Sequence, residues 1–205
     1  MTLEVTDLAV ARGGAPVLTG VSFRLDAGEA LVLRGPNGIG KTTLLRTLAG
    51  LQPAASGAVS FPEDTGAYAS HADGIKAQLT VVENLAFWAD VHGAKVPDTV
   101  YEAFDLVDLK TRFAGTLSAG QKRRLGLARL GVIGRKVLFL DEPTVSLDGF
   151  SVKMFARWLR EDHLAQGGIA VIATHIDLGL DAPELELSPF RATPEQGGGS
   201  DEAFL

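Results

Sequence analysis

The stretch GPNGIGKTT, from Gly35 to Thr43, decides how the chain folds around it. An apolar run at 30–33 precedes it and an amphipathic helical pattern at 42–49 follows, so it joins a strand to a helix. Its spacing, G-x-x-x-x-G-K-[ST], is typical of a loop whose backbone N–H groups surround a polyphosphate at a helix N-terminus. A glycine-rich turn with a chance lysine would not explain the strand and the helix. The stretch therefore predicts binding of a nucleoside triphosphate.

The composition limits the class of protein. The 205 residues predict one domain, alone or with an inserted subdomain. A formal charge of −6 argues against nucleic acid as the main partner, and the lack of cysteine excludes disulfides and favours a reducing compartment. No apolar run is long enough to span a bilayer, and the start MTLEVTDLAV is acidic where a signal peptide is basic. We expect a soluble protein that reaches membranes only through a partner.

Patterning along the chain predicts strands at both ends and helices between them. A turn at Gly13-Gly14 separates the first two strands, and Thr99 with Glu102 predicts a capping box on a helix that follows Pro97. His92 and His163 are expected to be solvated helix residues. The expected strands are 3–10, 17–25, 30–33, 59–61, 66–70, 137–140 and 169–174, and the expected helices include 42–49, one from 80, one after 97 and 151–165.

The segment KVLFLDEP places two carboxylates at the end of a buried strand. Four apolar residues precede Asp141 and Glu142, and Pro143 stops the strand. Ligands of open α/β sheets bind at the carboxyl ends of strands, so Asp141 is placed to hold magnesium and Glu142 to deprotonate a water. Two solvated acids at the start of a loop would leave the apolar run unexplained.

The segment LSAGQ, from Leu117 to Gln121, predicts a helix start with an unusual charge. Ser118 and Gln121 form a capping box pattern, whereas 122–124 (Lys-Arg-Arg) bring cations to a turn where the helix dipole disfavours them. We expect free N–H groups at Ser118 and Gly120, which would suit an external anion. That anion could be a phosphate bound to this chain or to a second copy.

These motifs, with Ser146-Leu147-Asp148 and Ala173-Thr174-His175, resemble in kind and order those of ABC transporter ATPase subunits, from Leu3 to about Leu187. The resemblance implies an α/β fold: a P-loop NTPase core with a mostly parallel sheet and an antiparallel β subdomain at the N-terminus. It also implies a helical subdomain at roughly 71–135. The domain would cover 1–190, and 191–205 would be a polar flexible tail.

The resemblance implies a head-to-tail dimer that holds two ATP molecules between its subunits. In that arrangement Lys41 binds the β- and γ-phosphates, Thr42 and Asp141 serve Mg²⁺, Glu142 is the general base, and His175 contacts the γ-phosphate. The implied nucleotide contacts are Gly35, Pro36, Asn37, Gly38, Ile39, Gly40, Lys41, Thr42 and Thr43, together with Ser118, Gly120, Gln121 and the interface residue Asp148 of the other copy.

Two positions depart from the family pattern. Arg12 stands where an aromatic ring usually stacks on adenine, although a guanidinium plane also stacks on bases. His71 stands where a glutamine usually links magnesium to the membrane partner, unless Gln78 or no residue fills that role. Protonation of an imidazole there would make coupling sensitive to pH.

Arg12, the segment 71–76 and the motifs together resemble the ATP-binding subunits of haem exporters in bacterial cytochrome c maturation. That resemblance implies a peripheral ATPase on the cytoplasmic face of the inner membrane, bound to integral permease subunits of that system. Its ATP hydrolysis would drive haem handling or release of a haem chaperone. The alternatives are the ATPase of another small exporter for drugs, lipids or ions, a soluble ABC switch, and a module that has lost catalysis; Glu142 and His175 argue against the last.

Overall fold

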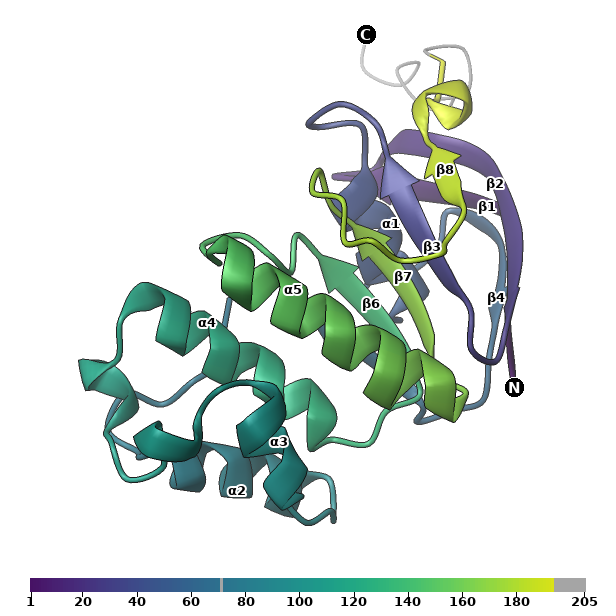
Figure 1. Cartoon of the computed structure of the whole chain (residues 1–205). Coiled ribbons are helices and arrows are strands. Elements are labelled where there is room, and N and C mark those ends of the chain that lie inside the picture. The colour runs from purple at the N-terminus through teal and green to yellow at the C-terminus, as the bar shows by residue number, and fades with distance from the viewer. Residues whose placement is uncertain (71, 194–205) are drawn as a thin grey trace, which may run out of the picture.

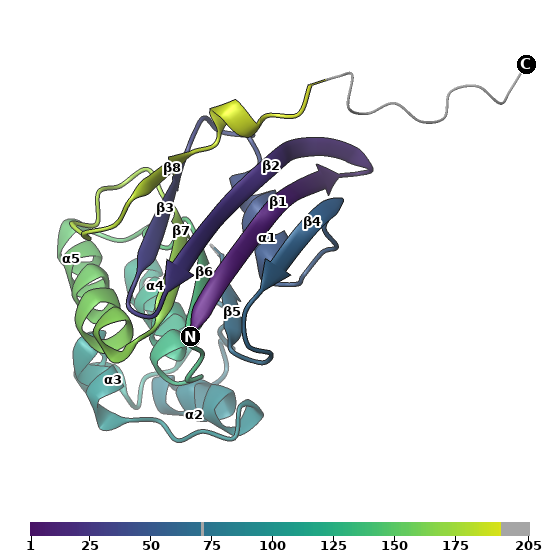
Figure 2. The ribbon, with the colours of Figure 1, turned by 90° about the vertical axis from the view of Figure 1, so that its right-hand side faces the viewer.

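A three-stranded antiparallel sheet forms the first layer of the molecule. The computed structural model describes residues 1–70 and 72–193 (Figures 1 and 2). Strands β1 (Thr2–Arg12) and β2 (Ala15–Asp26) pair through the expected turn, and β4 (Ser56–Ser60) pairs with the other edge of β1. Gly13 and Gly14 both have positive φ, 57° and 84°, which the tight turn requires. The two strands predicted at the N-terminus are confirmed.

The second layer is a five-stranded sheet in the order β5-β6-β7-β3-β8, and all its pairings are parallel. Its strands β6 and β7 are buried on both faces, which explains why their sequences are continuous apolar runs. Strand β8 was not expected; it is short, and its two glutamates are exposed. The strands are β3 (Ala30–Arg34), β5 (Gly66–Ala69), β6 (Val137–Asp141), β7 (Ile169–Ala173) and β8 (Glu184–Glu186).

Alternation along the parallel strands divides the core into two clusters. Phe139 and Val171 point toward the helix α1 (Lys41–Leu48) and the antiparallel sheet, whereas Leu138 and Ile172 point toward the remaining helices. Figures 1 and 2 show the parallel sheet between these two groups of elements. The sheet is therefore covered on both faces, as expected for an α/β protein. Among the described residues, no helix has the length and apolar character needed to cross a bilayer.

Helices α2 (Val81–Val91), α3 (Asp98–Ala103) and α4 (Ala119–Ala128) form the lower left of Figure 1. The capping box predicted at Thr99 and Glu102 is wrong: α3 begins directly after Pro97, with no side-chain cap. Thr80 and Glu83 form such a box on α2 instead, and the box predicted at the start of α4 is confirmed. A helical subdomain spanning roughly 71–135 remains our proposal.

The last long helix, α5 (Gly149–Trp158), continues through a π turn at Leu159–His163 and ends at Gly167. The expectation that His163 is solvated is wrong, because the residue is only 7% exposed and stacks on Trp158 at 5.9 Å between ring centroids. The wider π turn changes the helical phase, so a 3.6-residue period does not place this side chain correctly.

The expected tail begins with residues that contact the first sheet. Arg191 forms a β-bridge with Leu18, and the Ala192 N–H donates to the Val17 carbonyl at 3.0 Å. Residues 194–205 of the expected tail lie outside the described residues, as does His71.

Burial of His163 predicts a pH-dependent stability. Burial, with a smaller effect of Lys136, lowers the pKa of His163 from its usual 6.5, so the unfolded chain takes up a proton before the folded chain does. Stability is therefore fully present above about pH 6.5 and falls as the pH drops toward the lowered pKa, by about 1.4 kcal/mol per unit of difference. We expect His163→Gln to flatten the fall in unfolding free energy between pH 7.5 and 5, measured with urea. Parallel curves for the two proteins would contradict this assignment.

Candidate active site

The loop at 35–40 follows a backbone path that glycine makes possible. Gly35, Gly38 and Gly40 have φ of 137°, 82° and 122°, a region that side chains disfavour. A Cβ at Gly40 would also lie 2.8 Å from Val17 Cγ1. Lys41 is 8% exposed, and its Nζ donates to the carbonyls of Gly35 at 2.6 Å and Pro36 at 3.3 Å. Its ammonium group therefore lies against the backbone of the loop. The loop has the form that cradles phosphates.

Three predicted residues from separate segments meet beside this loop. The His175 Nε2 lies 3.1 Å from Asn37 Oδ1 in the loop and 3.4 Å from Glu142 Oε1 after β6. The side chains of His175 and Glu142 are 55% and 28% exposed, so both are accessible to a ligand and to water. The phosphate-binding loop, a carboxylate that can act as a base and an imidazole therefore lie together, in an arrangement able to hydrolyse a bound phosphate.

Glu142 adopts a conformation that is unusual for a residue with a side chain. Its φ is +48°, and its N–H donates to the Ala173 carbonyl at 2.8 Å. Backbone in this region costs of order 1–3 kcal/mol and persists where the surroundings fix it. The conformation turns the chain away from β6 directly after Asp141, and the carboxylate of Glu142 faces His175.

Asp141 has a partner that sequence reasoning missed. The Tyr68 hydroxyl, on the neighbouring strand β5, donates to Asp141 Oδ2 at 3.0 Å. Burial, and then the charge of Asp141, raise the pKa of Tyr68 to about 12, so the hydroxyl keeps its proton and remains a donor. A lone tyrosine in a short strand gives no signal unless the pairing of β5 with β6 is known.

The residues predicted to serve magnesium offer hard oxygen donors. Thr42 is exposed at the start of α1, and among the described residues nothing hydrogen-bonds to Asp141 Oδ1. No group of three or more His, Asp or Glu gathers into a metal site within the described ranges. Mg²⁺ prefers one or two protein oxygens with phosphates and water, so this donor set fits Mg²⁺ that arrives with a nucleotide.

Arg12 lies next to the phosphate-binding loop. Its Nη2 donates to the hydroxyl of Thr43 at 3.2 Å, and Thr43 is buried in the first turn of α1. The exposed end of β1 therefore carries a guanidinium beside the loop. Its stacking on a base remains a proposal.

The backbone N–H groups at the start of α4 differ from those expected. The Ser118 N–H donates to Gln121 Oε1 at 2.9 Å, so the free N–H expected at Ser118 is wrong. Arg123 is buried and Arg124 pairs with Asp105, which leaves Lys122 as the cation of the 122–124 run without an ion pair in the described part of the chain. The Ser118 hydroxyl accepts the Gln121 N–H at 3.2 Å, which completes the capping box, and Figure 1 shows α4 well away from α1.

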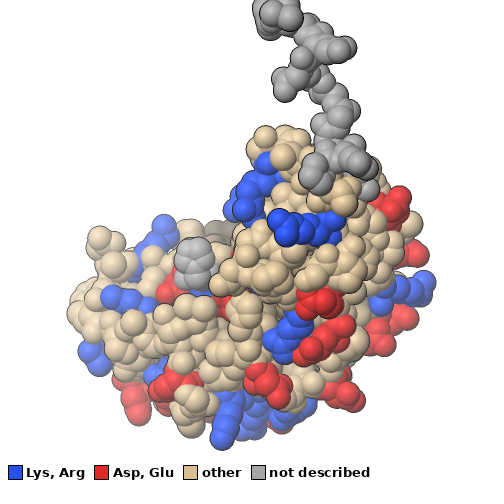
Figure 3. Space-filling model, turned by 90° about the horizontal axis from the view of Figure 1, so that it is seen from above, with Lys and Arg blue, Asp and Glu red and all other residues tan. Residues whose placement is uncertain are grey.

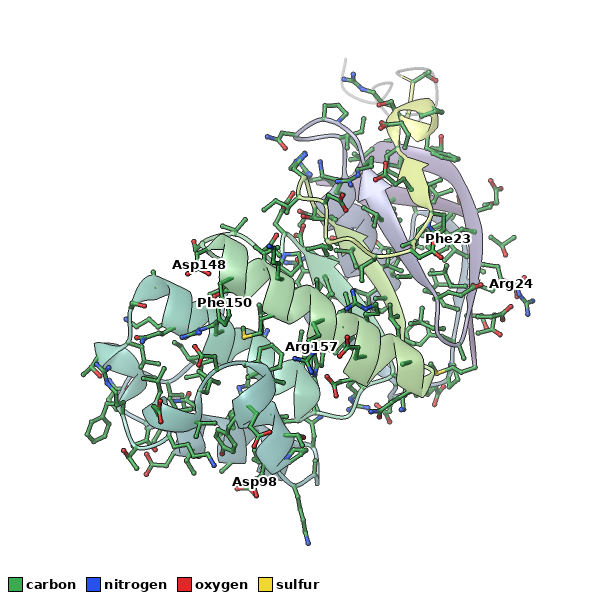
Figure 4. All side chains as sticks on the ribbon, in the orientation of Figure 1. Phe23, Arg24, Asp98, Asp148, Phe150 and Arg157 are labelled. Atoms are coloured by element: carbon green, nitrogen blue, oxygen red, sulfur yellow. The ribbon has the colours of Figure 1, made fainter. Side chains whose placement is uncertain are left out.

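Asp148 caps the helix α5, at the upper left of Figure 4. Its Oδ1 accepts the Ser151 N–H at 2.7 Å, and hydrogen bonding to Ser151 lowers the pKa of this carboxyl. A cap explains its position, and its role at an interface remains a proposal. His71 lies outside the described residues, and the alternative Gln78 is exposed.

Comparisons with known proteins agree with this geometry. A family model described as "ABC transporter" matches residues 18–145. A protein of Roseobacter denitrificans, "Cytochrome c biogenesis ATP-binding export protein CcmA", is 63% identical over 207 residues, and the same-named protein of Ruegeria pomeroyi is 62% identical over 205; each match covers 100% of both chains.

Solved structures share the fold. A putative ABC transporter ATP-binding protein from Pyrococcus furiosus has a TM-score of 0.83 at 24% identity, over 94% of this chain and 100% of its own. The protein cbiO1 of Clostridium perfringens, part of the complex cbiONQ, has a TM-score of 0.72 at 26% identity, over 85% and 78% of the two chains.

The hydrogen bond to Asp141 predicts a role for Tyr68 in metal affinity. Tyr68→Phe removes the donor that orients this carboxylate, and losing such a supporting group costs roughly 10-fold or more in metal affinity. We expect the Mg²⁺ concentration for half-maximal binding of a fluorescent ATP analogue to rise accordingly. The other tyrosine of the chain provides the control, since Tyr101→Phe also removes one hydroxyl, from a ring in α3 that lies beneath Lys110. Equal midpoints for both variants would remove Tyr68 from the site.

Proposed function

This chain belongs to the ABC transporter family, and we propose that it is the ATP-hydrolysing subunit of a membrane complex for cytochrome c biogenesis. The observation that carries hydrolysis is the meeting of Asn37, Glu142 and His175 beside the loop that holds Lys41. Similarity over the full length of the chain to the two named export proteins supports the biological role.

In the proposed mechanism each residue acts through the contacts described above. Lys41 and the loop N–H groups bind the β- and γ-phosphates, because a buried ammonium and inward N–H groups stabilise anionic oxygens. Mg²⁺, held with Thr42 and Asp141, would neutralise charge on the phosphates. Glu142 orients a water and accepts its proton as the water oxygen attacks the γ-phosphorus. The bond from the γ-phosphorus to the β–γ bridging oxygen breaks, and ADP leaves. His175 contacts the γ-phosphate and, from 3.4 Å, holds the carboxylate of Glu142 in place.

We propose that two copies pair head to tail, each closing the site of the other. The start of α4 is built around its own capping box and lies away from α1 in the same chain (Figure 1), which leaves it accessible to a second copy. Ser118, Gly120 and Gln121 would then contact the partner's ATP, with Asp148 at the interface. The face seen in Figure 3 carries both basic and acidic side chains rather than one basic surface.

We place the pair on the cytoplasmic face of the inner membrane, bound to permease subunits of the cytochrome c maturation system. ATP hydrolysis there would drive haem handling or release of a haem chaperone. The ATPase of another small exporter is the nearest alternative, because it needs the same catalytic residues. The printed names of the relatives favour cytochrome c biogenesis over drug, lipid or ion export.

Loss of the proposed base separates binding from hydrolysis. Glu142→Gln keeps the size of the side chain but cannot accept a proton, so we expect ATP turnover to fall by roughly 10²- to 10⁴-fold. ATP affinity should stay close to that of the wild type, and an ATP-bound dimer should accumulate on size exclusion. Glu4→Gln, at an exposed position of β1, is the matched control. Normal turnover by Glu142→Gln would remove the assignment as base.

Two further variants separate the halves of the shared site. Lys41→Ala removes a charged hydrogen-bond donor, and we expect ATP affinity to fall by roughly 10- to 100-fold. Ser118→Arg, made together with Glu142→Gln, should retain ATP affinity but fail to form the dimer, because its side chain fills the partner's phosphate contact.

Nucleotide titration and size exclusion with ATP measure the two properties. Ser60→Arg on the exposed edge strand β4 is the control for Ser118→Arg. Identical behaviour of Lys41→Ala and Ser118→Arg would contradict a site shared between copies.

A further inference from the structure

We propose that Arg123 is a positioning residue for Glu142, and that it makes the geometry of this base depend on the positions of Ser70 and Asp73. The proposal rests on the function proposed for Glu142. Arg123 lies in α4, is 4% exposed, and does not touch the phosphate-binding loop through any of its described hydrogen bonds. The assignment comes from its contacts with two separate parts of the chain.

The guanidinium of Arg123 binds the turn that follows β6. Its Nε donates to the Pro143 carbonyl at 2.9 Å, and its Nη2 donates to the Glu142 carbonyl at 3.1 Å. Two donors of one planar group on successive carbonyls fix the orientation of both peptide planes, because the guanidinium fork is rigid. A buried charge aimed at backbone oxygens is costly unless these bonds form.

Glu142 is held from both sides by these bonds. Its N–H donates to Ala173 in β7 and its carbonyl accepts from Arg123, so the two peptide groups that flank its Cα are fixed. The residue between them has a φ of +48° and carries the proposed base. If Arg123 withdraws, the Glu142 carbonyl keeps only the longer bond from the Val145 N–H, at 3.3 Å. The constraint on this side is then weaker, and the backbone can relax toward a commoner conformation. The carboxylate would then leave its place beside His175.

The other side of the guanidinium holds the segment that precedes and follows residue 71. Nη1 donates to the Ser70 carbonyl at 2.8 Å and to Asp73 Oδ1 at 2.9 Å. Gly126, one turn further along α4, permits this approach, since a Cβ there would lie 2.7 Å from the Cβ of Asp73. Four of the five N–H groups of Arg123 are thus used, two on the catalytic turn and two on this segment.

The chain that follows Asp73 is anchored to α2 at Lys76. The Asn84 side chain, 2% exposed, accepts the Lys76 N–H at 2.8 Å and donates to the Lys76 carbonyl at 3.0 Å. A displacement of Ser70, Asp73 or α4 is therefore transmitted to Glu142 through the buried side chain of Arg123. The structure assigns to Arg123 the link between the helical part of the chain and the catalytic base.

The test compares neighbouring arginines in the full-length chain. Arg123→Gln should lower kcat for ATP by roughly 10- to 100-fold, as expected when a catalytic group is slightly misplaced. KM and the dissociation constant of ATP should change little, because the loop and Lys41 are untouched. Arg123→Lys should not restore kcat, since an ammonium keeps the charge but not the planar fork. Arg124→Gln loses the pair with Asp105 and a charge that acts on Asp148, but no hydrogen bond to Glu142 or Pro143. It is the control and should turn over ATP normally.

A second variant keeps the test decisive if Arg123→Gln does not fold. Asp73→Asn keeps the size of the anchor and removes its charge, and it should lower kcat in the same direction with unchanged ATP affinity. Unchanged kcat in the folded variants, full rescue by Arg123→Lys, or parallel loss of affinity and turnover would overturn the proposal. A wild-type chain that binds ATP without hydrolysing it would instead overturn the proposed function.

Discussion

The parallel pairing of β3, β7 and β6 is the constraint on which the site depends. Leu33, Ala173 and Asp141 stand in one row of this ladder, so the three strands end level. The residues that follow each strand must leave the sheet at the same edge, which brings the loop at 35–40, Glu142 and His175 together. Because β6 and β7 are fully buried, water does not compete for these backbone bonds.

The ladder places the proposed catalytic residues but does not orient their side chains. Orientation comes from side chains on elements outside the three strands: Tyr68 on β5 binds Asp141, and Arg123 on α4 binds the turn at Glu142. Arg123 and Asp141 are buried and Tyr68 is partly buried, and burial makes an unmade hydrogen bond costly. The same physical effect thus supports both the proposed magnesium ligand Asp141 and the proposed base Glu142.

The sequence predicts what short-range patterns determine and misses what tertiary contacts determine. The phosphate-binding loop, the acids after β6 and the box at Ser118 each lie within about nine residues, so spacing alone identifies them. Tyr68 and Arg123 act across 73 and 19–53 residues, respectively, and no local pattern marks them. The predictions for His163 and Thr99 are wrong for a different reason. A π turn changes the helical phase at His163, and Pro97 sets the start of α3 before Thr99.

The bonds at the start of α4 change which atoms would meet a second nucleotide. Ser118 is the N-cap and its N–H is taken by Gln121, but its hydroxyl only accepts, from the Gln121 N–H, and so retains its own proton to donate. Gly120 is the second residue of the helix, and a capping box does not use that N–H. The dipole of α4 and Lys122 add positive potential there. In the proposed dimer, phosphate recognition therefore falls to the Ser118 hydroxyl and the Gly120 N–H, and the capping box holds both in place.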